Sequence, residues 1–504
     1  MREKQRFLQS FAKVYGERYT VYPSSFISEK HNFFFLVKDN SEKRKYLVVA
    51  GSSDVCKRFE GELIERPKAN LEVEKGNLIK FAPTTHQNLD LLRGLFPHLS
   101  PSTCSLRCSF GTGDRLGIAT PSHIRAFEGK NIFPVLAQQS VRENERTERS
   151  FQEVLDSAIW GCFEAGYRGK FGADADHVKR VEDLKEAVEC GYTMFTVDPS
   201  DFIKTSADLL TSGEKNEIYE KIAERKELER LYLGKTYSIK GEKFYFDANS
   251  FRDTVITYFD ALKHIVGCYF YLKENKKGDF DFEVSVDETS LPTLPLAHIF
   301  IVEELRRRGV DFQNLALRFS GQWQKGIDYI GDVEKLGGEL SIHANIAKTF
   351  GGYKLSLHSG SDKFSVYPLF AEKTEGLFHI KTSGTSWVEA VKVIAEKNPS
   401  LYREIHKFAL KNFEKDRLSY HVTTDLSRIP DVEKISDSEL KNLLDKPDSR
   451  QLIHITYGSI LSAKSDEGRH LFRDKIYATL FKHEKEHYDV VSSHIRRHLD
   501  LLKN

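Results

Sequence analysis

The sequence predicts an α/β protein organised around a closed (β/α)8 barrel of the TIM type. Eight short runs rich in β-branched and aromatic residues occur between residues 105 and 390. Amphipathic stretches of helical periodicity, such as 151–165 and 296–308, separate most of these runs. Strand and helix alternating eight times favour a closed barrel over an open doubly wound sheet. No GxGxxG motif opens a helix after a strand, which weakens a nucleotide-binding interpretation.

Polar or small residues follow each of the eight predicted strands. The runs are 106–110, 132–137, a brief run that ends at 172, 192–197, 282–286, 315–319, 353–357 and 377–381. The active site of a TIM barrel lies at the carboxyl ends of its strands. We therefore expect the polar residues that follow the runs to converge into one pocket.

Additions to the barrel account for the rest of the 504 residues. Residues 1–100 are predicted to form an N-terminal α+β extension, with strands at 33–37 and 46–50. The barrel occupies 101–390, and its segment 202–280 is too long for one connection. We interpret that segment as a helical insertion and a candidate lid or homo-oligomer contact. Residues 391–504 are predicted to form a mainly helical C-terminal region.

The last predicted helix, near 473–502, carries four histidines. They are His483, His487, His494 and His498. Their spacing spreads them around the helix, so we expect a solvated face and not a metal array.

Composition excludes several classes of partner. Hydrophobic residues make up 40% of the chain and charged residues 30%, which is ordinary for a globular protein. The net charge of +1 gives no general attraction to nucleic acid or to an anionic membrane. No apolar run reaches the roughly 20 residues that a spanning helix needs, and no signal-type apolar segment follows the N-terminus. The six cysteines form no CxxC pair, so we expect reduced thiols in a cytoplasmic protein.

The segment 172–177, GADADH, is the strongest chemical signal in the chain. It places Asp176 and His177 at the end of the third predicted strand. His358 follows the seventh strand, and two imidazoles with carboxylate oxygens suit a divalent transition metal such as Zn, Mn, Co or Ni. His298, early in the helix after the fifth strand, is the candidate third ligand. A structural, hydrogen-bonded histidine is the alternative for each of them.

Three carboxylates are candidate acid–base groups. Asp114 follows the first strand and is either a base or a structural partner of Arg115. Asp176 either transfers a proton or orients its neighbour His177. Glu288 follows the fifth strand and either binds the metal or moves protons.

The remaining polar strand ends are candidate substrate-binding groups. Arg115, Arg318 and Lys363 could hold a carboxylate, with a capped helix start as the alternative for the segment around Lys363. Lys381 is also a candidate Schiff-base lysine, as in metal-free aldolases. The full predicted set is Arg115, Gln138, Gln139, Arg318, Asp362, Lys363 and Lys381.

Four motifs resemble the tagaturonate/fructuronate epimerase family. They occupy residues 109–123, 135–146, 172–177 and 357–365. The resemblance extends over about 105–390 and implies a metal-dependent isomerase that interconverts two keto-hexuronates in hexuronate catabolism. No motif of residues 1–100 or 205–280 contributes to it.

A more distant similarity links the chain to class II metal aldolases. They also have an Asp-His pair like Asp176 and His177, and a histidine followed by small residues like His358. Their further metal histidine follows the sixth strand, where this sequence has no histidine (320–324, SGQWQ). The similarity to these aldolases therefore does not supply the third metal ligand of this chain.

Retro-aldol cleavage is the route that we expect for the implied reaction, and proton abstraction is the alternative route. The two keto-acids differ at a hydroxyl-bearing carbon, one carbon removed from the position next to the ketone, so the ketone does not acidify its C–H. Retro-aldol cleavage and re-addition on the other face avoids that step, with a metal as Lewis acid and two acid–base groups. The alternatives are a class II-like aldolase, a keto-sugar or keto-acid isomerase, and a non-catalytic sugar-binding barrel.

Overall fold

The computed structural model describes residues 2–64, 78–204 and 209–502, and a closed barrel of eight parallel strands forms its centre. Hydrogen bonds between the last barrel strand and the first close it, with His379 opposite Ser109. The predicted barrel is thereby confirmed. Its strands are β7 (Ser109–Thr112), β8 (Phe133–Ser140), β9 (Gly172–Val178), β10 (Met194–Val197), β13 (Asp281–Ser285), β14 (Asn314–Ala316), β15 (Lys354–Leu357) and β16 (Phe378–Thr382).

The alternation of side chains along the strands sorts apolar from charged residues. Phe282 and Val284 of β13 are fully buried in the hydrophobic core, whereas Glu283 between them joins polar groups of other strands inside the barrel. The same period of two separates Ala173 and Ala175 from Asp174 on β9. The barrel interior is therefore unusually rich in charge.

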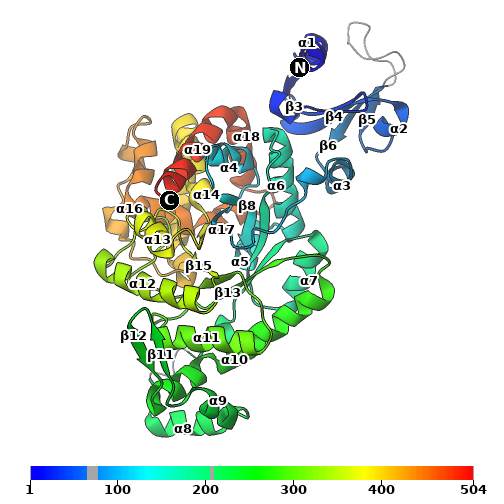
Figure 1. Ribbon diagram of the computed structural model, residues 1–504. Helices are drawn as coiled ribbons and strands as arrows, with labels where there is room; N and C mark the ends of the chain where they lie inside the picture. The colour runs from blue at the N-terminus through cyan, green and yellow to red at the C-terminus, as the bar shows by residue number, and fades with distance from the viewer. Residues whose placement is uncertain (1, 65–77, 205–208, 503–504) are drawn as a thin grey trace.

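A ring of helices surrounds the barrel and covers its strands (Figure 1). Local signals fix their ends: Ser150 and Glu153 form a capping box at the start of α6, and Gly166 ends it at φ 66°. The ring consists of α4 (Thr120–Phe127), α5 (Val141–Thr147), α6 (Phe151–Ala165), α7 (Val181–Cys190), α10 (Ala248–Asn275), α11 (Pro295–Arg307), α12 (Val333–Thr349), α13 (Tyr367–Thr374) and α14 (Thr385–Lys397).

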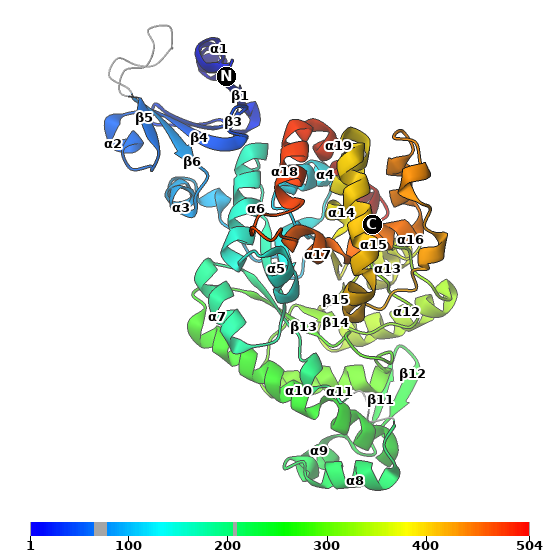
Figure 2. The same ribbon diagram turned by 180° about the vertical axis from the view of Figure 1, so that it is seen from behind.

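The N-terminal part is a separate antiparallel sheet that lies to one side of the barrel (Figures 1 and 2). Phe7 and Phe11 of the first helix pack against Phe33 and Phe35 of the sheet. The predicted strands at 33–37 and 46–50 lie within β3 and β4. The elements are α1 (Arg2–Tyr15), β1 (Tyr19–Val21), β2 (Ile27–Glu29), β3 (Asn32–Asp39), β4 (Arg44–Gly51), α2 (Ser53–Cys56), β5 (Glu62–Ile64), β6 (Leu78–Pro83) and α3 (His86–Leu95).

The segment predicted as a helical insertion is only partly an excursion from the barrel. It begins with helices α8 (Ser212–Glu220) and α9 (Arg225–Tyr232) and an antiparallel hairpin of β11 (Thr236–Ile239) and β12 (Glu242–Tyr245). The long helix α10 then packs between α7 and α11, so it belongs to the ring. A role as a lid or an oligomer contact stays a prediction.

The C-terminal region is helical and returns to the barrel. Its helices are α15 (Pro399–Asp416), α16 (Pro447–Ile455), α17 (Tyr457–Ser462), α18 (Arg473–Lys482) and α19 (Glu484–Asp500), with short 3-10 turns between α15 and α16. The last helix, α19, packs on α4 and α14 (Figure 2). His487 and His498 are consequently buried, at 1% and 0% exposure, and the expected solvated histidine face is wrong.

The cysteines and the helix lengths bear on two expectations from the composition. All six cysteines are free, in agreement with the expected reduced thiols. Among the described helices, none is long and apolar enough to cross a membrane.

Candidate active site

A polar cavity of about 280 Å³ lies at the carboxyl ends of the barrel strands. It brings together seven of the predicted site residues: Gln138, Asp176, His177, Glu288, Arg318, His358 and Lys381. The other lining residues are Ser140, Arg142, Glu143, Asp287, Thr289, Trp323, Lys325, Ser359, Ser383, Ser419, Tyr420 and His421. The expected convergence of polar strand ends is thus observed at this edge.

Two histidines face each other in this cavity. His177 lies at the end of β9 and His358 directly follows β15, and their ring centroids are 4.8 Å apart. Asp287 joins them, with Oδ1 3.1 Å from Nδ1 of His358. One ligand atom from each of the three residues lies within 4.8 Å of the others. Two imidazole nitrogens and one carboxylate oxygen are a donor set that suits a divalent transition metal.

Asp176 orients the first of these histidines. Its Oδ1 lies 2.8 Å from Nδ1 of His177, which leaves Nε2 of the ring toward the cavity, 4.0 Å from Glu288. A carboxylate behind a histidine is the usual support for a metal ligand. Burial opposes ionisation of Asp176, but the charges of Lys381 and His177 outweigh it and hold its pKa well below the ordinary value.

Lys381 is the positive centre of the barrel interior. Its Nζ lies 2.6 Å from Asp174, 2.7 Å from Asp176 and 2.8 Å from Glu283, and it donates to Thr196. Burial disfavours the charged amine, but the three carboxylates prevail and raise its pKa well above the ordinary value. A lysine held protonated in this way is a poor nucleophile, which argues against the Schiff-base alternative.

His358 is held from below by Glu283. Its Nε2 lies 2.6 Å from Oε1 of that carboxylate. Burial lowers the pKa of His358, but Asp287 and Glu283 act more strongly together and raise it to about 10. The ring is therefore fixed between two acids, one beneath it and one beside the cavity.

Three cations border the cavity beyond the acidic group. Arg142 Nη2 lies 3.9 Å from Glu288 Oε1, a loose ion pair. Lys325 donates to Ser359 Oγ at 3.0 Å. Arg318 is half-buried in the same wall. The cavity therefore offers positive charge to an anionic substrate group.

The two adjacent glutamines of β8 point to opposite sides. Gln138 lines the cavity, and both polar atoms of its amide are buried without a hydrogen-bond partner among the described residues. A Cβ at position 111 would lie 1.7 Å from Gln138 Oε1, so a larger residue there would displace the end of this side chain. Gln139 instead donates to Thr147 on the outer side, so its predicted contact with substrate is wrong.

Asp114 and Arg115 are structural. The Arg115 guanidinium lies 3.6 Å from the Tyr457 ring and pairs with Glu143, so it stands behind the cavity wall. The predicted role of Arg115 in binding a substrate carboxylate is therefore corrected, and so is the predicted role of Asp114 as a base. Asp114 caps its own turn by accepting hydrogen bonds from the backbone N–H groups of Leu116, Gly117 and Ala119.

His298 does not reach the metal group. It lies in α11, with Nδ1 2.9 Å from His343 Nδ1 in α12 and Nε2 2.5 Å from the Tyr353 hydroxyl. Both ring nitrogens are engaged within the helical layer, and the side chain is fully buried. The predicted third ligand is wrong, and Asp287 takes that place in the donor group. His343 is likewise buried, in contact with His298.

Asp362 and Lys363 face away from the cavity. The Asp362 carboxylate pairs with Arg450 at 3.1 Å and with His494 at 2.6 Å. Burial lowers the pKa of Lys363 to about 7. Neither residue is placed to bind substrate, which corrects the prediction. The Lys363 amine donates to three backbone carbonyls, those of Gln324, Ile327 and Ser361.

Several residues of the site had no predicted role. Asp287 directly precedes Glu288, so its position at a strand end was an available signal. Asp174 and Glu283 are charges inside apolar strands, a second available signal. Lys325 and Tyr420 come from long connections, where no periodicity indicates which way a side chain points.

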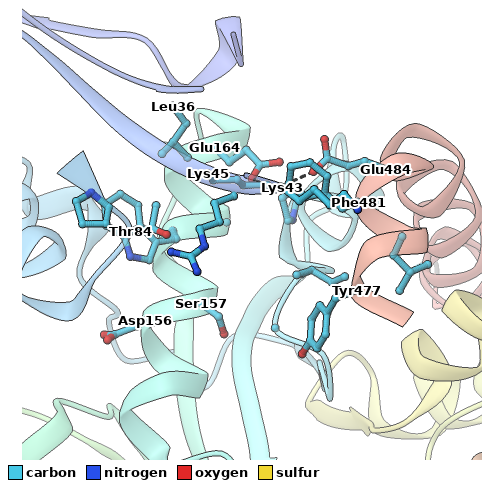
Figure 3. Close-up of a pocket in the computed structure, with 18 of the residues that line it drawn as sticks. Leu36, Lys43, Lys45, Thr84, Asp156, Ser157, Glu164, Tyr477, Phe481 and Glu484 are labelled. Carbon is cyan, nitrogen blue, oxygen red and sulfur yellow. Dashed lines mark hydrogen bonds and ion pairs between the residues drawn. The ribbon is translucent and has the colours of Figure 1, made fainter. Parts of the chain in front are cut away.

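A larger cavity of about 1,050 Å³ lies between the N-terminal sheet, α6, α18 and α19 (Figure 3). Its charged groups are largely matched with each other. Lys45 of β4 lies 2.6 Å from Glu164 of α6 and 2.9 Å from Glu484 of α19. These contacts join the N-terminal sheet to the barrel and to the C-terminal helix, remote from the strand ends.

The fold and the cavity together define a (β/α)8 barrel whose strand ends form a polar cavity, with a group of residues that could hold a metal ion. The chain belongs to the tagaturonate epimerase family (UxaE), whose model matches residues 22–502. It is 51% identical to the tagaturonate/fructuronate epimerase of Thermotoga maritima, over 98% of this chain and 99% of that protein.

Solved structures agree with this assignment. The fructuronate-tagaturonate epimerase UxaE of Cohnella laeviribosi, in a crystal structure complexed with glycerol, is 39% identical with a TM-score of 0.91. The alignment covers 100% of this chain and 99% of that one. The native crystal structure of the same enzyme gives the same identity and TM-score, over 99% of both chains.

Proposed function

We propose that this protein is an epimerase that interconverts D-tagaturonate and D-fructuronate in cytoplasmic hexuronate catabolism. Membership of the epimerase family over almost the whole chain is the observation that carries this proposal. The cavity supports it chemically, because a metal-type donor group and three cations line the same space. The free cysteines support a reducing compartment.

His177, His358 and Asp287 would hold the divalent metal, for which Zn, Mn, Co and Ni remain the candidates. The fit rests on the spacing of their ligand atoms and on the carboxylates Asp176 and Glu283 behind the two imidazoles. A bound ion supplies a Lewis acid that polarises a substrate oxygen.

Protein side chains supply the binding and the proton transfers. Arg318 and Lys325 would bind the substrate carboxylate, and the amide of Gln138, which has no hydrogen-bond partner among the described residues, would bind substrate hydroxyl groups. Glu288 is 37% exposed at the cavity wall and is the candidate group that exchanges protons with substrate. Asp176 is tied to Lys381 and His177, so we assign it the orientation of His177.

Retro-aldol cleavage and re-addition is the route that this arrangement supports. A base takes the proton of the hydroxyl on the carbon to be inverted, and the adjacent carbon–carbon bond breaks. The bonding electrons pass to the ketone fragment and the carbon becomes an aldehyde. Rotation of the aldehyde fragment, bond formation on its other face and return of the proton give the epimer without loss of atoms.

Metal-stripped protein incubated with tagaturonate tests the function, with Zn, Mn, Co or Ni added back separately and products identified by NMR. Metal-restored formation of fructuronate is the expected result. Release of free three-carbon products would favour the class II-like aldolase, and a positional keto-isomer would favour the isomerase. An absence of turnover with every metal would contradict the proposal.

Isotope labelling tests the route separately. Turnover in D2O should leave the inverted carbon unlabelled, because retro-aldol cleavage never breaks its C–H bond. Deuterium at that carbon would contradict cleavage and establish proton abstraction. A carbonyl trap that captures a three-carbon aldehyde during turnover is the complementary positive result.

A further inference from the structure

The loop that follows β15 brings His358 and Ser359 into the cavity and then turns away from it. Ser359 and Asp362 both have left-handed backbone conformations, with φ of 53° and 63°. Non-glycine residues seldom adopt this region unless the surrounding structure holds them there. The position of the two cavity residues thus depends on what holds this loop, defined as residues 358–363.

A buried ion cluster holds the far end of the loop. The Asp362 carboxylate pairs with Arg450 of α16 at 3.1 Å and with His494 of α19 at 2.6 Å. Glu389 of α14 completes the cluster, 2.9 Å from Arg450 and 3.4 Å from His494. Asp362, Arg450 and Glu389 are less than 9% exposed. In so dry a setting each charge depends strongly on its partners.

His498, also on α19, holds the loop backbone. Its Nδ1 donates to the carbonyl of His494 at 2.8 Å, so its Nε2 is the acceptor nitrogen. The backbone N–H of Asp362 donates to this Nε2 at 3.0 Å. Two histidines one helical turn apart therefore bind the side chain and the backbone of the same loop residue.

The same atoms could be taken for a second metal site, because Asp362, His494 and His498 each offer a ligand atom within 4.8 Å of the others. Their hydrogen bonds argue against it. Oδ2 of Asp362 faces Arg450, and the lone pair of His498 Nε2 already accepts the backbone N–H. A positively charged guanidinium in contact with the carboxylate disfavours a cation.

We infer that Asp362, Arg450, His494 and His498 are positioning residues, through which the C-terminal helix α19 fixes His358 and Ser359 in the cavity. Only the predicted change in turnover rests on the proposed function. Its effect on the loop itself can be measured in metal-free protein without substrate.

Three variants test the inference: Asp362→Asn, which keeps the shape and the backbone N–H; His494→Gln, at the more exposed edge of the cluster; and the control His487→Gln. His487 is buried on the same helix but lines the larger cavity between the N-terminal sheet, α6, α18 and α19. Hydrogen exchange of the 358–363 segment should accelerate by about tenfold or more in the first two variants and stay unchanged in the control.

Turnover and metal binding complete the test. Asp362 acts on His358 only through the loop. We therefore expect kcat and metal affinity to fall in Asp362→Asn by no more than the roughly 10- to 100-fold typical for loss of a direct hydrogen-bond partner of a metal ligand, with a smaller change in KM. His494→Gln should change both in the same direction. Unchanged loop exchange in both folded variants would overturn the inference. The inference would also be overturned if wild-type protein bound two metal ions and His494→Gln bound only one, because the cluster would then be a metal site. This result does not depend on turnover of the proposed substrate.

Discussion

The His177–His358 pair at the barrel mouth and the His298–His343 pair in the helical layer have similar spacing and opposite surroundings. Their ring centroids are 4.8 Å and 5.1 Å apart. Carboxylates surround the first pair. The second pair has no carboxylate among the partners given for the described residues, which are the two rings themselves, the Tyr353 hydroxyl and the backbone of Thr293. Spacing of histidines alone therefore does not make a metal site.

The difference is visible in the electrostatics. Asp287 and Glu283 overcome the cost of burial and raise the pKa of His358 to about 10. Burial, with no compensating acid, lowers the pKa of His343 to about 4 and that of His298 well below its ordinary value. An environment that stabilises positive charge on a histidine also stabilises a bound cation, and the second environment rejects both.

The largest expected effect concerns the counter-charge beneath the first pair. Lys381→Met leaves Asp174, Asp176 and Glu283 without their shared cation, so we expect the free energy of unfolding to fall by about 3–5 kcal/mol. Urea denaturation of metal-free protein measures this loss. Adding Glu283→Gln to the variant should recover part of it, and an undiminished stability of the single variant would contradict the assigned charge balance.

The second prediction separates the two pairs by function. His358→Ala or His177→Ala should weaken metal binding and turnover by at least about 100-fold, because removal of a ligand exceeds the effect of removing its outer partner. His298→Phe is the matched control and should change both by less than threefold. Isothermal titration with Zn and the NMR assay measure them. An equal loss in His298→Phe would restore His298 as a ligand.

The third prediction concerns the pH dependence of stability. Since the pKa of His298 is lowered on folding, the unfolded chain binds the extra proton below about pH 6.5, and this contribution to stability is lost as the pH falls. Between pH 7 and pH 5 the loss from this group is about 2 kcal/mol. The free energy of unfolding of His298→Phe should therefore fall between pH 7 and pH 5 by about 2 kcal/mol less than that of the wild type. Parallel pH profiles would contradict the neutral, buried histidine.

The smallest effect is expected from the hydroxyl that contacts His298. Tyr353→Phe removes this hydrogen bond from a fully buried site and should cost about 1 kcal/mol of unfolding free energy. Metal affinity should not change. Thermal unfolding combined with zinc titration checks both, and weaker zinc binding would show that the two histidine pairs are coupled.

The comparison also explains what the sequence could predict. The eight strands were identifiable because short β-rich runs end in polar residues, and this also located His177 and His358. His298 was assigned wrongly because a place early in a helix does not fix the direction of the side chain. Its partners His343 and Tyr353 come from other elements, which no local pattern connects to it.

Distant packing decided the other errors. Asp362 and Lys363 follow a strand end closely, but the left-handed turn at Ser359 and Asp362 turns both away from the cavity. Asp362 reaches the C-terminal helices, and Lys363 reaches backbone carbonyls of the segment after β14. The histidines of α19 looked solvated from their spacing alone. They are covered because α4 and α14, far away in the sequence, pack against that helix.

Anomalous diffraction from crystals loaded with one of the candidate metals is the most direct test of the central claim. We predict a single strong peak among His177, Asp287 and His358, in protein that interconverts tagaturonate and fructuronate. A peak beside His298, a peak only at the Asp362 cluster, or no peak in fully active protein would contradict the account.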